Sequence, residues 1–167
     1  MPNGLLAVDQ HNAQERYIYE TLLQKYANEN VPHQVLMFET TLTLNSVQML
    51  ALTELRSDLL KLGFSYSTSD DHPDRIIIKT QPMNTFGISA EELLVGIIDS
   101  YINKDEISSL SQYDRMLATT ACKASVKAGQ RLSVEEMRAI VTNLLKCEMQ
   151  YVCPHGRPII VFFPISE

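Results

Sequence analysis

The chain has 167 residues, of which 45% are hydrophobic and 20% are charged, and its net charge is −6 with a pI near 5.2. These values fit one soluble globular domain, or one domain with a small inserted lobe, and exclude a membrane-spanning segment because no run of about 18 apolar residues occurs. They also exclude a strongly basic, stand-alone nucleic-acid binder, so any contact with DNA is expected to be local and weak without a partner.

The cysteine content indicates a reducing compartment. Cys122, Cys147 and Cys153 are too few, and odd in number, for a disulfide framework. The first residues, Met-Pro-Asn-Gly-Leu-Leu, lack the basic and apolar regions of a secretory signal. We therefore expect reduced thiols in a cytosolic protein.

The first predicted elements are a strand and a helix. Residues 4–8 are apolar throughout and predict a short buried strand. A helical pattern follows from about 12 to 28, and Pro32 prevents it from continuing further.

The middle of the chain predicts a small β-α-β-β lobe over residues 34–82. Its predicted elements are a strand at 34–44, a helix at about 46–61, and strands at 64–67 and 75–79. Asn45 is a suitable helix N-cap with Gln48 three residues later, and Gly63 is a suitable C-cap.

The last half of the chain predicts a helical region followed by one strand. The predicted helices cover about 90–103, 111–127 and 134–147, and an apolar run at 157–163 is typical of a central strand. Capping-box patterns at 89–92 and 133–136 mark the starts of two of the helices. The predicted fold class is α+β, with one subdomain formed by both chain ends, 1–33 and 83–167, and the lobe inserted between them.

Metal-ligand side chains are concentrated near the two ends of the chain. In the first patch, His11 and Glu15 are four residues apart, so a helix places them on one face. Asp9 precedes this helix, where a carboxylate can cap the helix or bind a metal. The alternative interpretation is a surface pair of side chains beside an ordinary helix cap.

The second patch is the segment 153–158, Cys-Pro-His-Gly-Arg-Pro. Cys153 and His155 are two residues apart, so an extended segment directs both side chains to the same side. The alternative is a tight turn around a buried thiol. Because Asp, His, Glu and Cys are the side chains that bind zinc and related divalent ions, the two patches together predict a metal site if the fold brings them into contact.

A third stretch combines a thiol with positive charge. Cys122 follows small residues on a predicted helix, and its alternative interpretation is a core thiol. Lys123, Lys127 and Arg131 make its neighbourhood positive within an acidic protein. Such a cluster suits a phosphate backbone, although a solvated helix end has the same composition.

These three stretches, in this order, resemble the C-terminal domain of the MutL DNA mismatch-repair family, and the resemblance covers essentially the whole chain. Residues 9–20, Asp-Gln-His-Asn-Ala-Gln-Glu-Arg-Tyr-Ile-Tyr-Glu, resemble the family motif DQHAxxExxxxE. Residues 121–125 resemble the ACR motif, with Lys123 in place of arginine, and residues 153–158 match the third motif. Asn12 replaces the usual alanine, which we interpret as a mild change on the exposed side of the helix.

The resemblance implies a metal-dependent endonuclease that nicks one strand of duplex DNA. The residues at the family's metal positions are Asp9, His11, Glu15, Cys122, Cys153 and His155. The implied catalytic set is Asp9, His11, Glu15, Glu20 and Arg157. Within these sets Glu15 is expected to bridge two ions, and Glu20 and Arg157 to support the site. The expected ions are Mn²⁺ for catalysis and Zn²⁺ in a structural or regulatory role.

The resemblance also implies partners: duplex DNA, a second copy of the chain, a MutS-type mismatch-recognition protein acting through the full-length protein, and a sliding clamp. The family's clamp-binding segment reads Gln-x-x-(Leu/Ile)-x-Pro, and the corresponding stretch runs from Gln34 to Glu39. Met37 replaces the branched residue and Glu39 replaces the proline. Residues 34–82 would form the regulatory, external subdomain, and the expected location is the bacterial cytoplasm, in association with the nucleoid.

The comparison with the family also indicates a fragment. The family's ATPase domain, a strand before the first motif and a helix after the third have no counterpart here, so activity or dimer formation is expected to be incomplete. The alternative function is a dimerisation and scaffold module with little or no catalysis, in which a structural zinc ion ties the two chain ends together.

Overall fold

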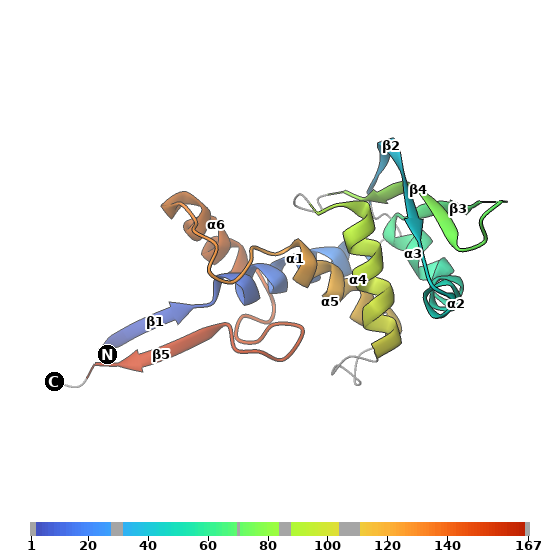
Figure 1. Cartoon of the computed structure of the whole chain (residues 1–167). Helices are drawn as coiled ribbons and strands as arrows, with labels where there is room; N and C mark the ends of the chain where they lie inside the picture. Colours follow the sequence, from blue (N-terminus) through green and yellow to red (C-terminus); the bar gives the residue numbers. More distant parts are fainter. Residues whose placement is uncertain (1–2, 28–31, 70, 84–87, 104–110, 166–167) are drawn as a thin grey trace.

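The computed structural model describes residues 3–27, 32–69, 71–83, 88–103 and 111–165, and in this part of the chain two antiparallel sheets lie at opposite ends of a group of helices (Figure 1). The elements in chain order are β1 (Gly4–Val8), α1 (Gln10–Ala27), β2 (His33–Thr43), α2 (Ser46–Glu54), α3 (Arg56–Leu62), β3 (Ser65–Thr68), β4 (Arg75–Pro82), α4 (Ala90–Asn103), α5 (Gln112–Ala124), α6 (Val134–Leu144) and β5 (Ile160–Pro164). The predicted α+β class is confirmed. Residue 28, the last of the first predicted helix, lies outside the described ranges.

The two ends of the chain meet in a two-stranded ribbon. β1 and β5 are antiparallel, with Leu5 opposite Phe163 and Val8 opposite Ile160. The sequence predicted that both strands are buried, and this is wrong for the single chain. Leu5 is 62% exposed and Phe163 is 53% exposed, and only the inner end of the ribbon, at Val8 and Ile160, packs against buried side chains.

The predicted β-α-β-β lobe contains one more helix than expected. Its sheet has the order β2-β4-β3 and is antiparallel throughout. The capping box of Asn45 and Gln48 is confirmed, but the helix predicted over 46–61 is divided at Leu55, where the backbone has φ −80° and ψ −4°. Gly63 ends α3 in the left-handed region at φ 99°, a conformation that favours glycine.

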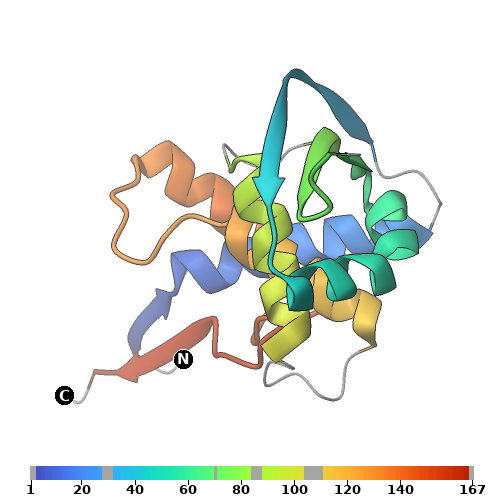
Figure 2. The same ribbon diagram turned by 45° about the vertical axis from the view of Figure 1, so that its right-hand side comes forward.

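One cluster of buried side chains connects the lobe to the central helices. It includes Leu59 and Ile78 from the lobe, Leu93 from α4, Leu117 from α5 and Ile18 from α1. α4 packs against both the lobe and α5, and α5 packs against α1, so these helices lie between the ribbon and the three-stranded sheet (Figures 1 and 2). The division into subdomains at 34–82 stays a prediction, since the buried cluster is continuous across these limits.

A second, smaller cluster of buried side chains lies beside the ribbon. It joins Ala13 of α1, Ile140 and Leu144 of α6, and Cys153 and Ile159 of the segment that leads to β5. This packing attaches the C-terminal segment to the start of α1. None of the helices within the described ranges combines the length and the apolar character needed to cross a membrane.

Candidate metal centre

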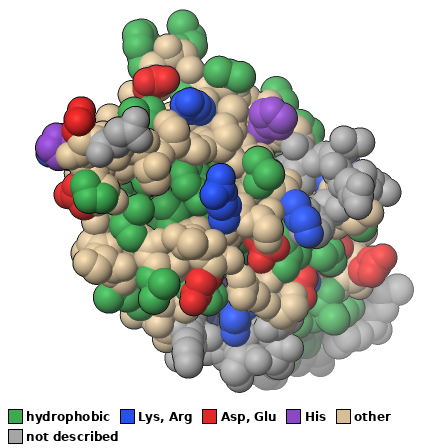
Figure 3. All heavy atoms as spheres, turned by 90° about the vertical axis from the view of Figure 1, so that its right-hand side faces the viewer, with side chains coloured by type: hydrophobic (Ala, Val, Ile, Leu, Met, Phe, Trp, Pro, Cys, Tyr) green, Lys and Arg blue, Asp and Glu red, His purple; other side chains and the backbone are tan. Residues whose placement is uncertain are grey.

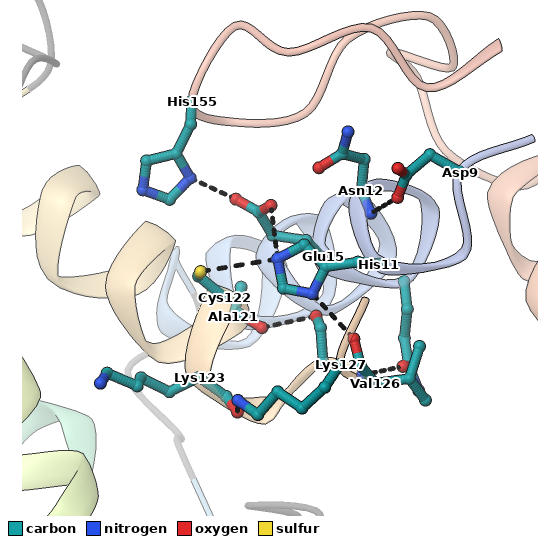
Figure 4. A network of polar contacts seen from close by, with 12 residues as sticks. Asp9, His11, Asn12, Glu15, Ala121, Cys122, Lys123, Val126, Lys127 and His155 are labelled. Atoms are coloured by element: carbon teal, nitrogen blue, oxygen red, sulfur yellow. Dashed lines mark hydrogen bonds and ion pairs between the residues drawn. The ribbon is translucent and has the colours of Figure 1, made fainter. Parts of the chain in front are cut away.

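α1 carries the first group of potential ligands. Its N-terminus is capped by Asp9, whose Oδ1 accepts a hydrogen bond of 2.9 Å from the backbone N–H of Asn12. One turn of helix separates His11 and Glu15, and both side chains point toward α5 and the C-terminal segment (Figure 4). The predicted helical spacing of these two residues is therefore confirmed.

The imidazole of His11 is held in one orientation by the backbone. Its Nδ1 lies 2.8 Å from the carbonyl oxygen of Val126, and a carbonyl only accepts, so Nδ1 donates the proton. Nε2 then faces the site, 3.7 Å from Cys122 Sγ and 3.7 Å from Glu15 Oε2. A backbone carbonyl that fixes the outer nitrogen in this way is the usual support for a metal-binding histidine.

Glu15 is the centre of the arrangement. It is 1% exposed, its Oε1 pairs with His155 Nδ1, and its Oε2 faces His11. Two groups of potential metal ligands share this carboxylate, with the donor atoms of each group within 4.8 Å of one another: His11, Glu15 and Cys122 in one, and Glu15, Cys153 and His155 in the other. A carboxylate shared in this way can bridge two ions.

The protonation of the site follows from these contacts. Hydrogen bonds with Cys153 and Glu15 raise the pKa of His155 to about 10, against the opposing effect of burial. Burial, followed by the charge of Glu15, raises the pKa of the Cys122 thiol. Because a metal binds neutral imidazole and thiolate, an ion entering this site has to displace these protons.

A second face of α1 holds the C-terminal segment in place. The side-chain amide of Asn12 donates to the carbonyl of Pro158 at 3.0 Å, and Arg16 Nε donates to the carbonyl of Val152 at 2.9 Å. One turn further, the Glu20 carboxylate accepts from the backbone N–H groups of Glu148 and Met149 at 2.8 and 3.1 Å. These contacts position Cys153 and His155 over Glu15.

The interpretation of Asn12 as a mild exposed change is wrong. Asn12 is 7% exposed and donates a hydrogen bond to the segment that carries two of the potential ligands. The sequence contained a signal for this role, because Asn12, Arg16 and Glu20 recur every four residues and so share one helix face.

A third face of α1 holds the segment that follows α5. Gln14 Oε1 accepts from the backbone N–H of Val126 at 2.7 Å, and Gln10 Nε2 donates to the carbonyl oxygens of Lys127 and Gln130. These contacts fix the Val126 carbonyl that orients His11. Sequence reasoning missed both glutamines, although they too are four residues apart.

The structure brings together most of the predicted site residues. His11, Glu15, Cys122, Cys153 and His155 belong to the two ligand groups. Among the described residues, Asp9 and Glu20 lie outside both groups, since Asp9 caps α1 and Glu20 binds backbone N–H groups. Cys147 is buried with its Sγ 3.5 Å from the carbonyl of Asn143 and belongs to neither ligand group.

Arg157 contributes mainly through its backbone. Its carbonyl accepts from the N–H of Cys153 at 2.8 Å, and Gly156 closes the same turn at φ 79° by donating to the Cys153 carbonyl. The Arg157 side chain is exposed, and its charge is one of those that lower the pKa of Cys122 against the effect of burial. It therefore shapes the turn that presents Cys153 and His155.

The donor atoms fit a divalent ion of the zinc type. Thiolate and imidazole ligands favour Zn²⁺, and three protein ligands with an open position are typical of catalytic rather than structural zinc sites. Mn²⁺ prefers oxygen ligands, of which Glu15 is the one carboxylate in the two groups. A manganese ion here would need water or phosphate oxygens to complete its coordination.

Removing the Glu20 carboxylate should loosen the C-terminal segment. In Glu20→Ala, the N–H groups of Glu148 and Met149 lose their acceptor, so amide hydrogen exchange at these two positions should become faster. Lys25→Ala, on the last turn of the same helix, is the control and should leave this exchange unchanged. Unchanged exchange in Glu20→Ala would show that the carboxylate does not hold the segment.

The comparisons with known proteins identify the family. Residues 1–132 match the family described as the MutL C terminal dimerisation domain. Three relatives carry the name DNA mismatch repair protein MutL. The protein from Chloroherpeton thalassium is 35% identical to this chain over 99% of its length. The proteins from Chlorobium limicola and Prosthecochloris aestuarii are each 33% identical to it, over 99% and 98% of its length. The chain spans 26% of the length of each of these relatives. It therefore belongs to the family of MutL C-terminal dimerisation domains.

Proposed function

We propose that this domain is a metal-dependent endonuclease that nicks one strand of duplex DNA in mismatch repair. The observation that carries the proposal is the buried carboxylate of Glu15, shared between two groups of potential metal ligands from three separate segments of the chain. The names of its relatives support a role in mismatch repair. We further propose that the domain acts in the bacterial cytoplasm, near the nucleoid, with a MutS-type protein as a partner of the full-length protein.

Each residue of the site would have its own role in binding the metal ions. Glu15 would hold two ions at a fixed separation, His11 and Cys122 would complete one coordination shell, and Cys153 and His155 the other. Bound ions would lower the pKa of an attacking water and neutralise charge on the scissile phosphate. We propose Zn²⁺ for the thiol-containing shells, and Mn²⁺ where water and phosphate oxygens join Glu15.

Removing the shared carboxylate charge should abolish catalysis. Glu15→Gln keeps the size of the side chain but removes the anionic ligand. The rate of manganese-dependent nicking of supercoiled plasmid should therefore fall by about a hundredfold or more, a loss typical of removing a group that stabilises charge in the transition state. Circular dichroism would check that the fold is retained. The control is Glu91→Gln, an exposed glutamate in the first turn of α4, which should nick as the unchanged chain does.

Two results of this experiment would contradict the proposal. If Glu15→Gln nicks plasmid as fast as Glu91→Gln, the site is not the source of the activity. If neither the unchanged chain nor Glu91→Gln nicks the plasmid with manganese present, the chain has no endonuclease activity of its own.

A structural role for the metal is the second candidate function. The ligand groups join α1, α5 and the segment before β5, so an ion would cross-link parts of the chain that are more than a hundred positions apart, such as Glu15 and His155. In this scaffold module, zinc would stabilise the fold and catalysis would be weak or absent.

Chelation followed by thermal unfolding separates the two functions. If the metal is mainly catalytic, a chelator should stop nicking and shift the melting temperature by only a few degrees, because packing and the hydrogen bonds of α1 hold the fold. If the metal is structural, its removal should lower the melting temperature far more, because binding free energy is then folding free energy. Calorimetry with and without the chelator measures the difference.

We also propose that two copies of the chain pair through the β1–β5 ribbon. The ribbon exposes large apolar side chains on both strands: Leu5, Leu6, Val161, Phe162 and Phe163. Such a surface is typical of a protein interface, and the family description names dimerisation. The apolar sequences of the two terminal strands, which predicted burial, are then explained because the strands are buried in the dimer.

A charge on the ribbon should weaken the dimer. Leu6→Lys places an ammonium group on the proposed interface, so sedimentation should detect a shift from dimer to monomer. The matched control is Leu50→Lys on α2, since Leu50 is 62% exposed and Leu6 is 64% exposed. A Leu6→Lys chain that stays as dimeric as the control would contradict the proposed interface.

The segment from Gln34 to Glu39 supports a proposal of sliding-clamp binding. It lies on β2, which forms the top of the molecule in Figure 1, and hydrophobic side chains project at the same height in Figure 3. Met37 is 92% exposed and Phe38 is 82% exposed, and the pairing of β2 with β4 is irregular between Val35 and Thr40. A docking peptide segment needs such accessible apolar side chains.

A further inference from the structure

A cavity of about 260 Å³ opens beside the metal centre, between α4, α5 and the C-terminal segment. Cys122 and His155, one from each ligand group, form part of its wall. Lys123 and Gly96 form another part. A ligand that occupies this cavity therefore touches the metal-binding residues and the first lysine of the positive stretch.

The Lys123 side chain lies against a glycine in the interior of α4. A Cβ atom on Gly96 would lie 2.8 Å from Lys123 Cε, 3.6 Å from Cδ and 3.5 Å from Nζ. Glycine lowers the stability of a helix interior relative to alanine, and no positive φ requires it here. What glycine provides at this position is the space in which the lysine lies.

The ammonium group of Lys123 is not used in an ion pair between described residues. Those pairs are His11–Glu15, Arg16–Glu20 and His155–Glu15. Lys127, the next lysine, turns back to donate to the carbonyl of Lys123 at 3.0 Å, whereas the Lys123 side chain extends away from this contact (Figure 4) and lines the cavity. Lys123 is thus a cation of the cavity wall that is not paired with a carboxylate among the described residues, whereas His155 is paired with Glu15.

The remaining wall supplies hydrogen-bonding groups. The hydroxyl groups of Thr119 and Ser100 are hydrogen-bonded to each other at 3.0 Å, and Asn103 adds an amide. The carboxylate in the wall, Asp99, accepts a hydrogen bond from Gln48 through Oδ1 at 3.1 Å, which directs this oxygen toward α2. A cation with a hydroxyl and an amide is a combination that binds phosphate oxygens.

We infer that Lys123, seated on Gly96, binds a phosphate of the DNA backbone next to the scissile one, and so sets the position of the DNA over the metal centre. This inference rests on the proposed endonuclease function, because it assigns the place of the substrate in that same site. It makes Lys123 a substrate-binding residue and Gly96 a positioning residue that acts through it.

Two substitutions test the charge and its position separately. Lys123→Met removes the ammonium group. Gly96→Ala keeps the ammonium group but adds a methyl group where the lysine side chain lies against α4, so the side chain has to move. Binding to a short DNA duplex is measured by fluorescence anisotropy without metal, over a range of salt concentrations. For Lys123→Met the magnitude of the slope of log K against log salt should fall by about 0.9, the value for one phosphate contact. For Gly96→Ala it should fall by less, because the flexible end of the lysine can shift away from the added methyl group.

Nicking by the same variants gives a second readout. With manganese, KM for plasmid should rise about tenfold while kcat changes less, since the lost contact holds substrate and transition state alike. Lys123→Arg should restore both the salt slope and KM, because arginine also binds phosphate. Gly96→Ala should melt no lower than the unchanged chain, since alanine favours the helix.

The controls separate this inference from the proposed function. Lys79→Met removes one positive charge from an exposed position on β4 and should leave the salt slope and KM unchanged. If Lys123→Met or Gly96→Ala behaves as Lys79→Met does, while Glu15→Gln abolishes nicking, the phosphate site is wrong and the endonuclease stands. If the unchanged chain does not nick DNA but both variants lower the salt slope, the phosphate site stands and the endonuclease fails.

Discussion

A carboxylate that is 1% exposed has to be surrounded by groups that replace water, and this requirement on Glu15 organises the rest of the site. The partners come from other parts of the chain: His155 from the segment before β5 and Cys122 from α5, with His11 one turn away on α1. His155 can approach Glu15 only if the two ends of the chain lie side by side, and Cys122 only if α5 packs against α1. The pairing of β1 with β5 and the packing of α1 against α5 provide this arrangement.

Each face of α1 contributes to this arrangement through different contacts. Gln10 and Gln14 hold the segment after α5, His11 and Glu15 carry ligand atoms, and the third face, through Asn12, Arg16 and Glu20, holds the C-terminal segment. The two supporting faces act mainly on backbone carbonyl and N–H groups. The positions of Cys153 and His155 therefore depend on the geometry of a turn as much as on the identity of their neighbours. A substitution on a supporting face can move a ligand without touching it.

The limits of sequence reasoning are visible at particular residues. The spacing of His11 and Glu15 predicted their shared face, and the turn chemistry of Asp9 and Asn45 predicted helix caps, because these are local properties. Cys122 entered the site only through the resemblance to a family, since nothing in its neighbourhood specifies a partner more than a hundred positions away. The helical pattern places Asn12 on one face with Arg16 and Glu20, but it does not say that this face contacts the Pro158 carbonyl, so Asn12 was interpreted as exposed. The break at Leu55 was missed because no glycine or proline marks it.

The apolar strands at the chain ends show a second limit of sequence reasoning, and it bears on how an acidic domain would bind DNA in the proposed function. A hydrophobic pattern predicts burial but does not say whether the same chain or a partner provides it, and β1 and β5 are exposed in the single chain. Since each copy carries a net charge of −6, pairing two copies doubles the repulsion that a DNA backbone meets at long range. Affinity must then come from short-range contacts at places where positive charge is concentrated. The neighbourhood of Cys122 is such a place, so one of the residues that would hold the metal, Cys122, and the residue that would hold DNA, Lys123, are neighbours on α5.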